Sequence, residues 1–456
     1  MKVQNKSFGL LALCLGLAAA AVPSGAATQT VPGKTWEKIT DVSKYGFDRA
    51  KLVEAQKFAA ENLATAAVMV VVDGKILFEW GAVETKYLLH SGRKSFMSAL
   101  YGKYVENGAI DLDQTMAELG IDDEPPLTEV EKKATVRHCL MARSGIYHDA
   151  EAEAPSMRAV KPPRGSKKPG EFWLYNNWDF NVLLTVFEQK TGKKFFEALG
   201  EDILMPIDCE NYMPEDGIYQ KTGASVHPAY HFVLTARDMA RFGLLMLRNG
   251  KWNDRQVVSS AWVKESTSYM SDAEIYGGDG YGYMWWVAKK GNKIPHFPAV
   301  DLPDGTYSAR GAGGHYMIVL PDRDMVIVHR VNTFESNNVG PNGFGLLVRK
   351  ILDAGDPAAR PFPSQTPEEA GKLAGTYERE DGPPLTVTLS GASLVLKTPG
   401  QPDNKLIQVE QDVFYPILSN GTYLRFERGE NGEPTGLLLR QYRGDSKARK
   451  IAEITS

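Results

Sequence analysis

The sequence His90-Ser91-Gly92-Arg93-Lys94-Ser95 opens a segment whose apolar residues have helical spacing as far as Val105. A separation of three places Ser91 and Lys94 on the same helical face, one turn apart. Free serine is a poor nucleophile and needs an adjacent base. Lysine can be that base when its pKa falls, and burial together with the positive end of a helix dipole favours the neutral amine. The segment therefore predicts a serine nucleophile beside a lysine base.

By itself a Ser-x-x-Lys pattern occurs by chance, and its ordinary explanation is a helix cap followed by a solvated lysine. Two later stretches add weight to the catalytic interpretation. Tyr175-Asn176-Asn177 lies 84 residues beyond Ser91, just before a helical segment. Arg310-Gly311-Ala312-Gly313-Gly314-His315 leads into a strand, and glycines there let an edge strand approach a ligand closely.

As an ordered set, these three motifs resemble those of the penicillin-recognising serine hydrolases. That family includes class C β-lactamases, D-alanyl-D-alanine carboxypeptidases, related esterases and nylon-oligomer hydrolases. The resemblance covers about residues 45–353 and is supported by residues 134–146, 235–243 and 281–286. It implies an α+β fold in which a β-lactamase/transpeptidase-like antiparallel sheet is flanked by helices.

The resemblance also implies a role for each motif residue. Ser91 would attack a carbonyl carbon, while neutral Lys94, alone or with Tyr175, takes the hydroxyl proton. The backbone N–H groups of Ser91 and of a residue near Gly311 would bind the oxyanion. Tyr175 would pass a proton to the leaving group, and Asn177 would orient Lys94 or the substrate.

Two Lys-Thr-Gly triplets, at residues 190–192 and 221–223, imitate the third motif of the family. The first ends a helical segment, where glycine is the expected cap, and the second precedes a helix rather than a strand pair. The family places this motif on a strand before a terminal hairpin and helix, which only residues 309–315 satisfy. The chain therefore lacks the motif lysine that helps β-lactamases hold the substrate carboxylate. His315 is expected either to replace that polar group or to be a packing residue.

The flanking segments predict how the main domain is organised. A helical pattern over residues 47–63 precedes a hairpin over 67–80 with Asp73-Gly74 at its turn. A second hairpin over 316–331 precedes a helix near 343–353. One antiparallel sheet is expected to take strands from both ends of the domain, with helices packed around it.

The composition changes after residue 355. Residues 356–368 contain four prolines and are interpreted as a linker. Short strands separated by turn residues follow in 369–456, so we expect a small C-terminal all-β domain, either a barrel or a sandwich. The hydrolase domain is accordingly placed at residues 27–355.

The first 26 residues have the features of a secretory signal peptide. Lys2 and Lys6 precede an apolar run from Phe8 to Val22, and small residues follow up to Ala26. A membrane anchor is the alternative, but spanning a bilayer needs about 20 apolar residues. We expect cleavage near Ala26 and a periplasmic or secreted protein without a membrane span.

The composition excludes several classes of protein. The 456 residues carry a net charge of -4 with 43% hydrophobic residues, which argues against intrinsic disorder and against nucleic-acid binding.

Only two cysteines, Cys139 and Cys209, lie beyond the predicted signal peptide, and whether they approach each other stays open. His227 and His231 have zinc-like spacing, but Pro228 interrupts the helix that such a pair needs. We expect no metal and no cofactor.

The sequence therefore predicts a secreted serine hydrolase that cleaves an ester or amide bond through an acyl-enzyme on Ser91. Its partner would be a small-molecule ester or amide, or a peptide substrate. A D-alanyl-D-alanine carboxypeptidase or β-lactamase is one alternative, and a catalytically silent peptidoglycan-binding protein is another. The oligomeric state stays open.

Overall fold

The computed structural model describes residues 30–273, 278–289, 295–391, 393–441 and 444–453. The predicted signal peptide, residues 1–26, lies outside these ranges. Within them, no helix combines the length and apolar character needed to cross a bilayer. Cys139 and Cys209 are both free thiols, and Cys139 is buried.

An eight-stranded antiparallel sheet forms the centre of the main domain in the described part of the chain, in the order β2-β1-β13-β12-β11-β10-β9-β8. Strand β1 from the start of the domain pairs with β13 from its end, for example at Val70 and Ile327. The sequence prediction of one sheet built from both ends is thereby confirmed. The strands are β1 (Thr65–Val72), β2 (Lys75–Gly81), β8 (Ser271–Asp272), β9 (Gly280–Tyr281), β10 (Trp286–Val287), β11 (Tyr307–Gly311), β12 (His315–Leu320) and β13 (Met325–Val331).

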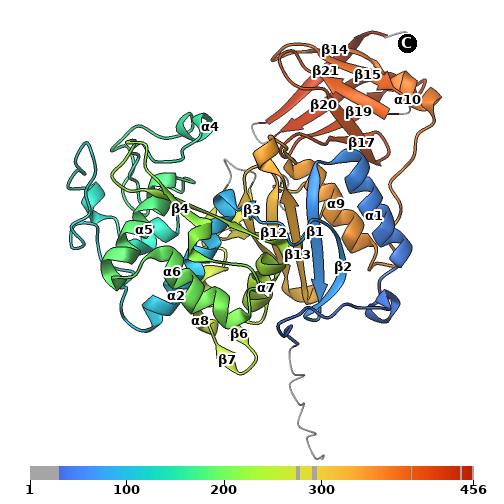
Figure 1. Cartoon of the computed structure of the whole chain (residues 1–456). Coiled ribbons are helices and arrows are strands. Elements are labelled where there is room, and N and C mark those ends of the chain that lie inside the picture. The colour runs from blue at the N-terminus through green and yellow to red at the C-terminus, as the bar shows by residue number, and fades with distance from the viewer. Residues whose placement is uncertain (1–29, 274–277, 290–294, 392, 442–443, 454–456) are drawn as a thin grey trace, which may run out of the picture.

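Helices cover both faces of this sheet (Figure 1). Side chains alternate along a strand, so Val68 and Val70 of β1 pack with α1 (Arg49–Asn62) and α9 (Pro341–Asp353). Met69 and Val71 face the opposite core, which includes α2 (Arg93–Glu106) and α7 (Ala236–Leu247). Complete burial of each such side chain contributes roughly 1.5–3 kcal/mol, which is why β1 is apolar on both faces.

A helical region is inserted between β2 and β8. It carries α2 and α7 together with a small sheet in the order β3-β5-β4. Its other elements are α3 (Val136–Leu140), α4 (Pro155–Arg158), α5 (Asn177–Thr191), α6 (Phe195–Leu199), α8 (Ser260–Ser266), β3 (Tyr87–Leu88), β4 (Gly217–Gln220), β5 (Ala229–Leu234), β6 (Lys251–Trp252) and β7 (Arg255–Gln256).

The C-terminal region is a closed barrel of strands β14 to β21, which decides between the two predicted all-β forms. Closure pairs β14 with β21 and leaves no unpaired sheet edge. The elements are α10 (Pro367–Leu373), β14 (Gly375–Arg379), β15 (Leu385–Ser390), β16 (Ser393–Lys397), β17 (Asn404–Glu410), β18 (Val413–Pro416), β19 (Tyr423–Arg428), β20 (Pro434–Gln441) and β21 (Gly444–Ala452). The sequence did not predict β14 and β21.

The barrel packs against α1 and α9 of the main domain (Figure 1). Asn342 in the first turn of α9 donates hydrogen bonds from Nδ2 to the carbonyl oxygens of Pro416 at 2.9 Å and Thr422 at 2.7 Å. Tyr415 of β18 donates a hydrogen bond from its hydroxyl to the carbonyl oxygen of Pro298 at 3.0 Å. The barrel is thus fixed to the main domain by polar and apolar contacts.

Candidate active site

Ser91 lies in a single 3-10 turn (His90–Gly92) that runs directly into α2. Lys94, in the first turn of α2, donates a hydrogen bond from Nζ to Ser91 Oγ at 3.0 Å. The predicted one-turn separation of alcohol and amine is therefore found. If the amine is neutral, the same distance allows the hydroxyl to donate to the nitrogen lone pair instead, which is the geometry of general base catalysis.

The environment of Lys94 favours the neutral amine. The side chain is buried, with 1% of its surface exposed. Burial, followed by the charge of Arg93, holds the pKa of Lys94 well below its ordinary value. The amine faces aromatic rings instead of a carboxylate, because Nζ lies 4.8 Å from the ring centroids of both Tyr175 and Phe180.

Arg93 is a component of the site that the sequence analysis missed. Its side chain is only 2% exposed, and Nη1 donates a hydrogen bond to the carbonyl oxygen of His90 at 2.9 Å. Its Cζ lies 4.8 Å from the ring centroid of Tyr230, and Nε and Nη2 have no hydrogen-bond partner among the described residues. Because arginine keeps its charge in proteins, an unpaired guanidinium beside Lys94 disfavours a second cation there.

Tyr175 precedes α5 and lies beside the lysine. Its ring is 9% exposed and stacks on Trp286, with centroids 5.4 Å apart and an interplanar angle of 24°. Phe180, one turn into α5, contacts the same tyrosine at 4.9 Å. The structure thus brings Ser91, Lys94 and the Tyr175 ring together, although they are far apart in the sequence.

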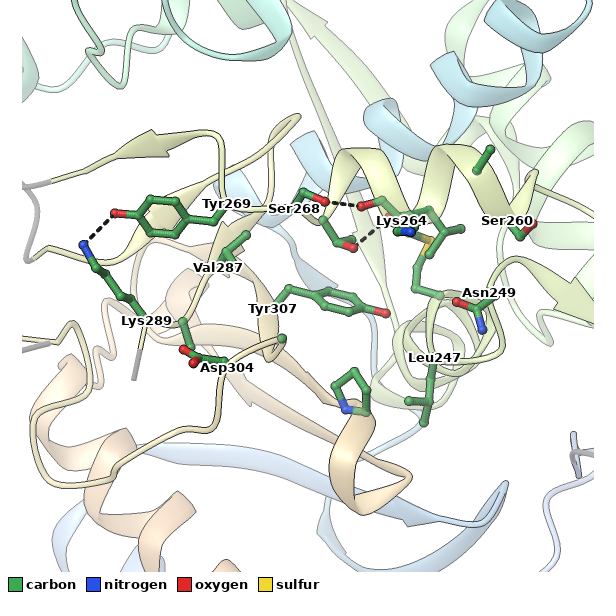
Figure 2. A pocket seen from close by; sticks show the side chains of 17 residues that line it. Leu247, Asn249, Ser260, Lys264, Ser268, Tyr269, Val287, Lys289, Asp304 and Tyr307 are labelled. Carbon is green, nitrogen blue, oxygen red and sulfur yellow. Dashed lines mark hydrogen bonds between the residues drawn. The ribbon is translucent and has the colours of Figure 1, made fainter. Parts of the chain in front are cut away.

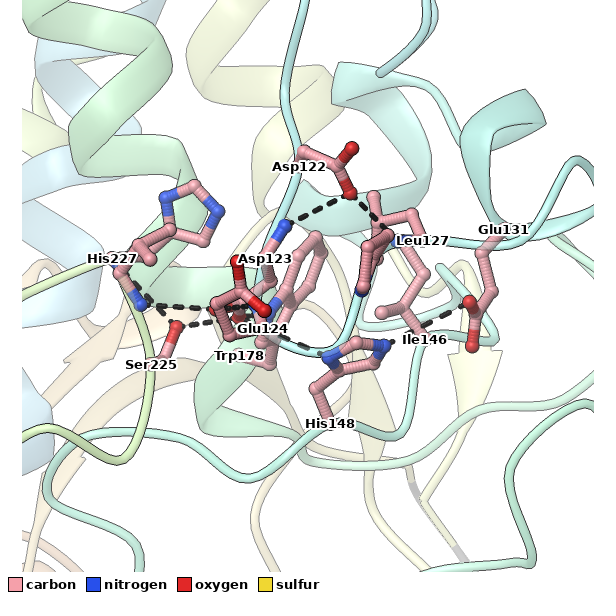
Figure 3. Close-up of polar contacts among 12 residues, drawn as sticks. Asp122, Asp123, Glu124, Leu127, Glu131, Ile146, His148, Trp178, Ser225 and His227 are labelled. Atoms are coloured by element: carbon pink, nitrogen blue, oxygen red, sulfur yellow. Dashed lines mark hydrogen bonds and ion pairs between the residues drawn. The ribbon is translucent and has the colours of Figure 1, made fainter.

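A buried polar network fixes the start of α5 next to Tyr175 (Figure 3). Trp178 donates a hydrogen bond from Nε1 to Asp123 Oδ2 at 2.7 Å, and Ser225 Oγ donates to the same oxygen at 2.6 Å. Burial raises the pKa of Asp123, but hydrogen bonds led by that from Ser225 hold it below its ordinary value. His148 lies between Asp123 and Glu131, at 4.0 and 3.8 Å from their carboxylates. The sequence offered no motif that predicts this network.

Asn177 is the first residue of α5, and its side chain is directed to a neighbouring loop. Nδ2 donates a hydrogen bond to the carbonyl oxygen of Ala152 at 2.6 Å. The buried Oδ1 has no hydrogen-bond partner among the residues described. The predicted role of Asn177 in orienting Lys94 or substrate stays a prediction.

Gly311 ends β11 and brings that strand against the turn that carries Ser91. A Cβ added to Gly311 would lie 2.2 Å from the carbonyl oxygen of Leu89, which directly precedes that turn. Only glycine therefore permits this approach of two backbones. The arrangement is compatible with a backbone N–H near Gly311 in the oxyanion hole, which stays a prediction.

His315 lies at the start of β12 and is fully buried. Its ring centroid is 5.2 Å from that of His90, and Thr333 Oγ1 lies 2.9 Å from His90 Nε2 and 3.4 Å from His315 Nε2. Burial, ahead of nearby cations, lowers the pKa of His90 to about 4, and burial also holds the pKa of His315 far below its usual value. The observed contacts of His315 are with His90 and Thr333, and its contact with substrate stays a prediction.

Both Lys-Thr-Gly triplets make structural contacts. The expectation that the second triplet precedes a helix rather than a strand pair is wrong, because residues 221–223 lie between β4 and β5, which pair with each other. Gly192 caps the C-terminus of α5 with a left-handed φ of 68°. The second triplet holds the buried carboxylate of Glu151, because the N–H groups of Thr222, Gly223 and Ala224 donate to Oε1 at 2.8 to 3.0 Å.

A separate hollow of about 760 Å³ lies between the end of α7, α8 and the strands around Val287 and Tyr307 (Figure 2). Its wall includes Lys264, Tyr269 and Asp304, and contains none of the residues that the sequence singled out. The hollow is therefore distinct from the Ser91 site.

Comparisons with known proteins identify the family of this chain. The model of the Beta-lactamase family matches residues 51–348, so this chain belongs to the β-lactamase family of serine hydrolases. The family predicted from the ordered motifs is thereby confirmed.

Individual relatives are more distant. The chain is 25% identical over 305 residues to a 6-aminohexanoate-dimer hydrolase of Paenarthrobacter ureafaciens, covering 59% of this chain and 72% of that protein. It is 22% identical over 341 residues to penicillin-binding protein 4 of Amycolatopsis lactamdurans, covering 66% and 87%. The octameric penicillin-binding protein homologue from Pyrococcus abyssi has a similar fold, with a TM-score of 0.52 at 19% identity over 88% of this chain and all of that one.

Proposed function

We propose that this protein hydrolyses an ester or amide bond through an acyl-enzyme on Ser91. The observation that carries the proposal is the 3.0 Å contact between Ser91 Oγ and the buried Lys94 Nζ. The ring of Tyr175, 4.8 Å from the same nitrogen, supplies a phenol close to the pair. Family membership supports hydrolysis in general, and the bond cleaved is our inference.

Acylation starts with neutral Lys94. The amine takes the hydroxyl proton of Ser91 while Oγ forms a bond to the substrate carbonyl carbon, which leaves a tetrahedral oxyanion. Backbone N–H groups at Ser91 and near Gly311 stabilise that charge. The bond to the leaving group then breaks, and the proton held by Lys94 passes through Tyr175 to the departing oxygen or nitrogen.

Deacylation reverses the proton movements. Tyr175 and Lys94 take a proton from water as its oxygen attacks the acyl carbon, and the second tetrahedral intermediate collapses. The ester bond to Ser91 Oγ breaks, the proton returns to Oγ, and the free acid leaves. Each cycle consumes one water and restores the neutral lysine.

The preferred substrate class is an ester or amide without a required carboxylate beside the reacting carbonyl. The chain lacks the third-motif lysine expected to hold such a group, and residues 309–315 end instead in Gly-Gly-His. One relative is named a 6-aminohexanoate-dimer hydrolase, which supports this choice. Penicillin-binding protein 4 is the relative that favours the second candidate, a D-alanyl-D-alanine carboxypeptidase or β-lactamase.

The proposal is tested with Ser91→Ala. The variant is expected to lose turnover of short-chain nitrophenyl esters and all labelling by a fluorophosphonate probe. Ser98→Ala is the matched control, since Ser98 lies on α2, which directly follows the turn of Ser91, is fully buried and has no hydrogen-bond partner for Oγ among the described residues. Normal labelling of Ser91→Ala would refute the assignment of the nucleophile.

Parallel assays separate the alternatives. Nitrocefin turnover, D-alanyl-peptide cleavage or durable labelling by a fluorescent penicillin would favour the second candidate over an esterase or amidase. Binding to peptidoglycan without turnover of any substrate would favour the silent binding protein.

We also propose that the protein is exported, on the basis of the leader-like residues 1–26. N-terminal sequencing of the protein from a periplasmic or culture fraction is expected to begin near residue 27. An intact N-terminus in the cytoplasmic fraction would contradict export.

A further inference from the structure

Tyr175 belongs to a series of aromatic rings that contact one another beside the site. Its neighbour Trp286 is 9% exposed and lies nearly parallel to it. Arg310, on the strand that carries Gly311, places its Cζ 4.9 Å from the ring centroid of Trp286 and 4.8 Å from that of Phe297. Phe297 in turn contacts Phe344 of α9, with centroids 5.2 Å apart. A buried cation is thus held between two aromatic rings, one of which supports the tyrosine.

The guanidinium is held in place by polar contacts as well. Arg310 Nη2 donates a hydrogen bond to Asp279 Oδ2 at 2.6 Å, and Nε donates to Ser308 Oγ at 2.9 Å. Arg310 is 7% exposed and Asp279 is 4% exposed, so the ion pair is shielded from solvent. A planar guanidinium group that makes hydrogen bonds at two nitrogens has little freedom to rotate. Its plane is therefore fixed, as stacking against an aromatic ring requires.

We propose that Arg310 is a positioning residue for Tyr175, acting through the ring of Trp286. The arginine does not touch the reacting atoms. It fixes the tilt of Trp286, and Trp286 fixes the ring that lies over Lys94. A displacement of about 1 Å in a catalytic group can lower a rate by 10²-fold, so the support of this ring matters for turnover.

The kinetic part of this inference rests on the proposed function, so the experiment includes a readout that does not need activity. Protein labelled with 3-fluorotyrosine gives one ¹⁹F resonance for each tyrosine, and the Tyr175 resonance is assigned by its loss in Tyr175→Phe. In Arg310→Met, this resonance is expected to shift or broaden. Ester turnover is expected to show kcat reduced on the order of 10- to 100-fold, with KM nearly unchanged.

Two variants distinguish charge from shape. Arg310→Lys keeps a cation that can lie over the Trp286 ring but loses the hydrogen-bonded guanidinium group. Compared with Arg310→Met, it is expected to regain part of kcat and part of the native Tyr175 resonance position. Asp279→Asn removes the counter-charge while the arginine stays, and it is expected to move the Tyr175 resonance in the same direction as Arg310→Met, by less. If Arg310→Met fails to fold, Asp279→Asn tests the same inference in its place.

Arg241→Met is the matched control. Arg241 is likewise buried, lies 5.2 Å from the ring centroid of Trp36 and 6.0 Å from that of Trp252, and pairs with Glu210 at 3.1 Å. It is expected to lose stability while kcat and the Tyr175 resonance stay as in the wild type. An unchanged Tyr175 resonance in Arg310→Met, or an equal change in Arg241→Met, would overturn the inference. Absence of wild-type turnover would refute only the proposed function, because the resonance still tests the positioning.

Discussion

At the scale of single residues, Arg93 and Lys94 place two cationic side chains next to each other in the chain, and both are buried. Neither has a carboxylate partner among the hydrogen bonds and ion pairs of the described residues. Burial lowers the pKa of both groups, but the lysine has the lower ordinary value and loses its proton first. The arginine therefore helps to make the lysine a base.

Arg93→Met tests this effect through the pH dependence of turnover. If neutral Lys94 is the base, as we propose, kcat/KM falls as pH decreases through the pKa of Lys94. Removal of the neighbouring cation raises that pKa, so the acid limb of the profile is expected to move to higher pH. Arg241→Met, the control variant used above, also removes a buried cation and is expected to retain the wild-type limb. An acid limb that stays in place in Arg93→Met would contradict the role of the arginine.

The residues of this site differ in how readily they could be predicted from the sequence. Ser91, Lys94 and Tyr175 could be identified because their order and spacing match a known set. Arg93 could not, since a charged residue at the start of a helix ordinarily points to solvent. Its burial depends on Tyr230, which arrives from β5, and such a tertiary contact leaves no local pattern.

At the scale of elements, the approach of β11 to the turn that carries Ser91 depends on Gly311. Gly311→Ala would place a Cβ 2.2 Å from the carbonyl oxygen of Leu89, so one of the two backbones must move. We expect the free energy of unfolding, measured by urea denaturation, to fall by about 1–3 kcal/mol. We also expect kcat to fall by about tenfold or more, because a small displacement of catalytic groups lowers the rate strongly.

Gly371→Ala in α10 provides the comparison. A Cβ there meets no atom within 4 Å, and alanine is the better helix former. Stability and turnover are expected to equal or exceed those of the wild type. Equal behaviour of the two alanine variants would contradict the argument from close approach.

Strands were predictable where their inward residues are large and apolar. In β15 apolar and polar residues alternate, and in β16 Leu394 and Leu396 are buried while Ser393 and Val395 are less so. β21 carries small or polar inward residues, Ser446 and Ala448, among charged ones. Its pairing with β14 supplies the strand character, and that pairing is long-range, so the sequence could not distinguish a closed barrel from a sandwich.

At the scale of the whole molecule, Asn342 joins the main domain to the barrel through two buried hydrogen bonds. Asn342→Ala leaves the carbonyl oxygens of Pro416 and Thr422 without these donors. We expect the free energy of unfolding to fall by about 1–3 kcal/mol and the barrel to become more susceptible to proteolysis, measured by limited trypsin digestion and calorimetry.

Asn338→Ala is the corresponding control, because Asn338 is exposed and lies just before the same helix. Its cleavage pattern and melting temperature are expected to match those of the wild type. If Asn342→Ala behaves in the same way, the two hydrogen bonds do not secure the barrel.

The pairing of β1 with β13 also has a consequence for synthesis on the ribosome. A nascent chain that has emerged only as far as residue 300 already contains Ser91, Lys94 and Tyr175, but it lacks β11, β12 and β13, the partners that complete the sheet. Contacts between such distant segments form late and slowly. Ser91, the proposed nucleophile, is therefore translated early but should acquire its reactivity only after residues 307–331 have emerged.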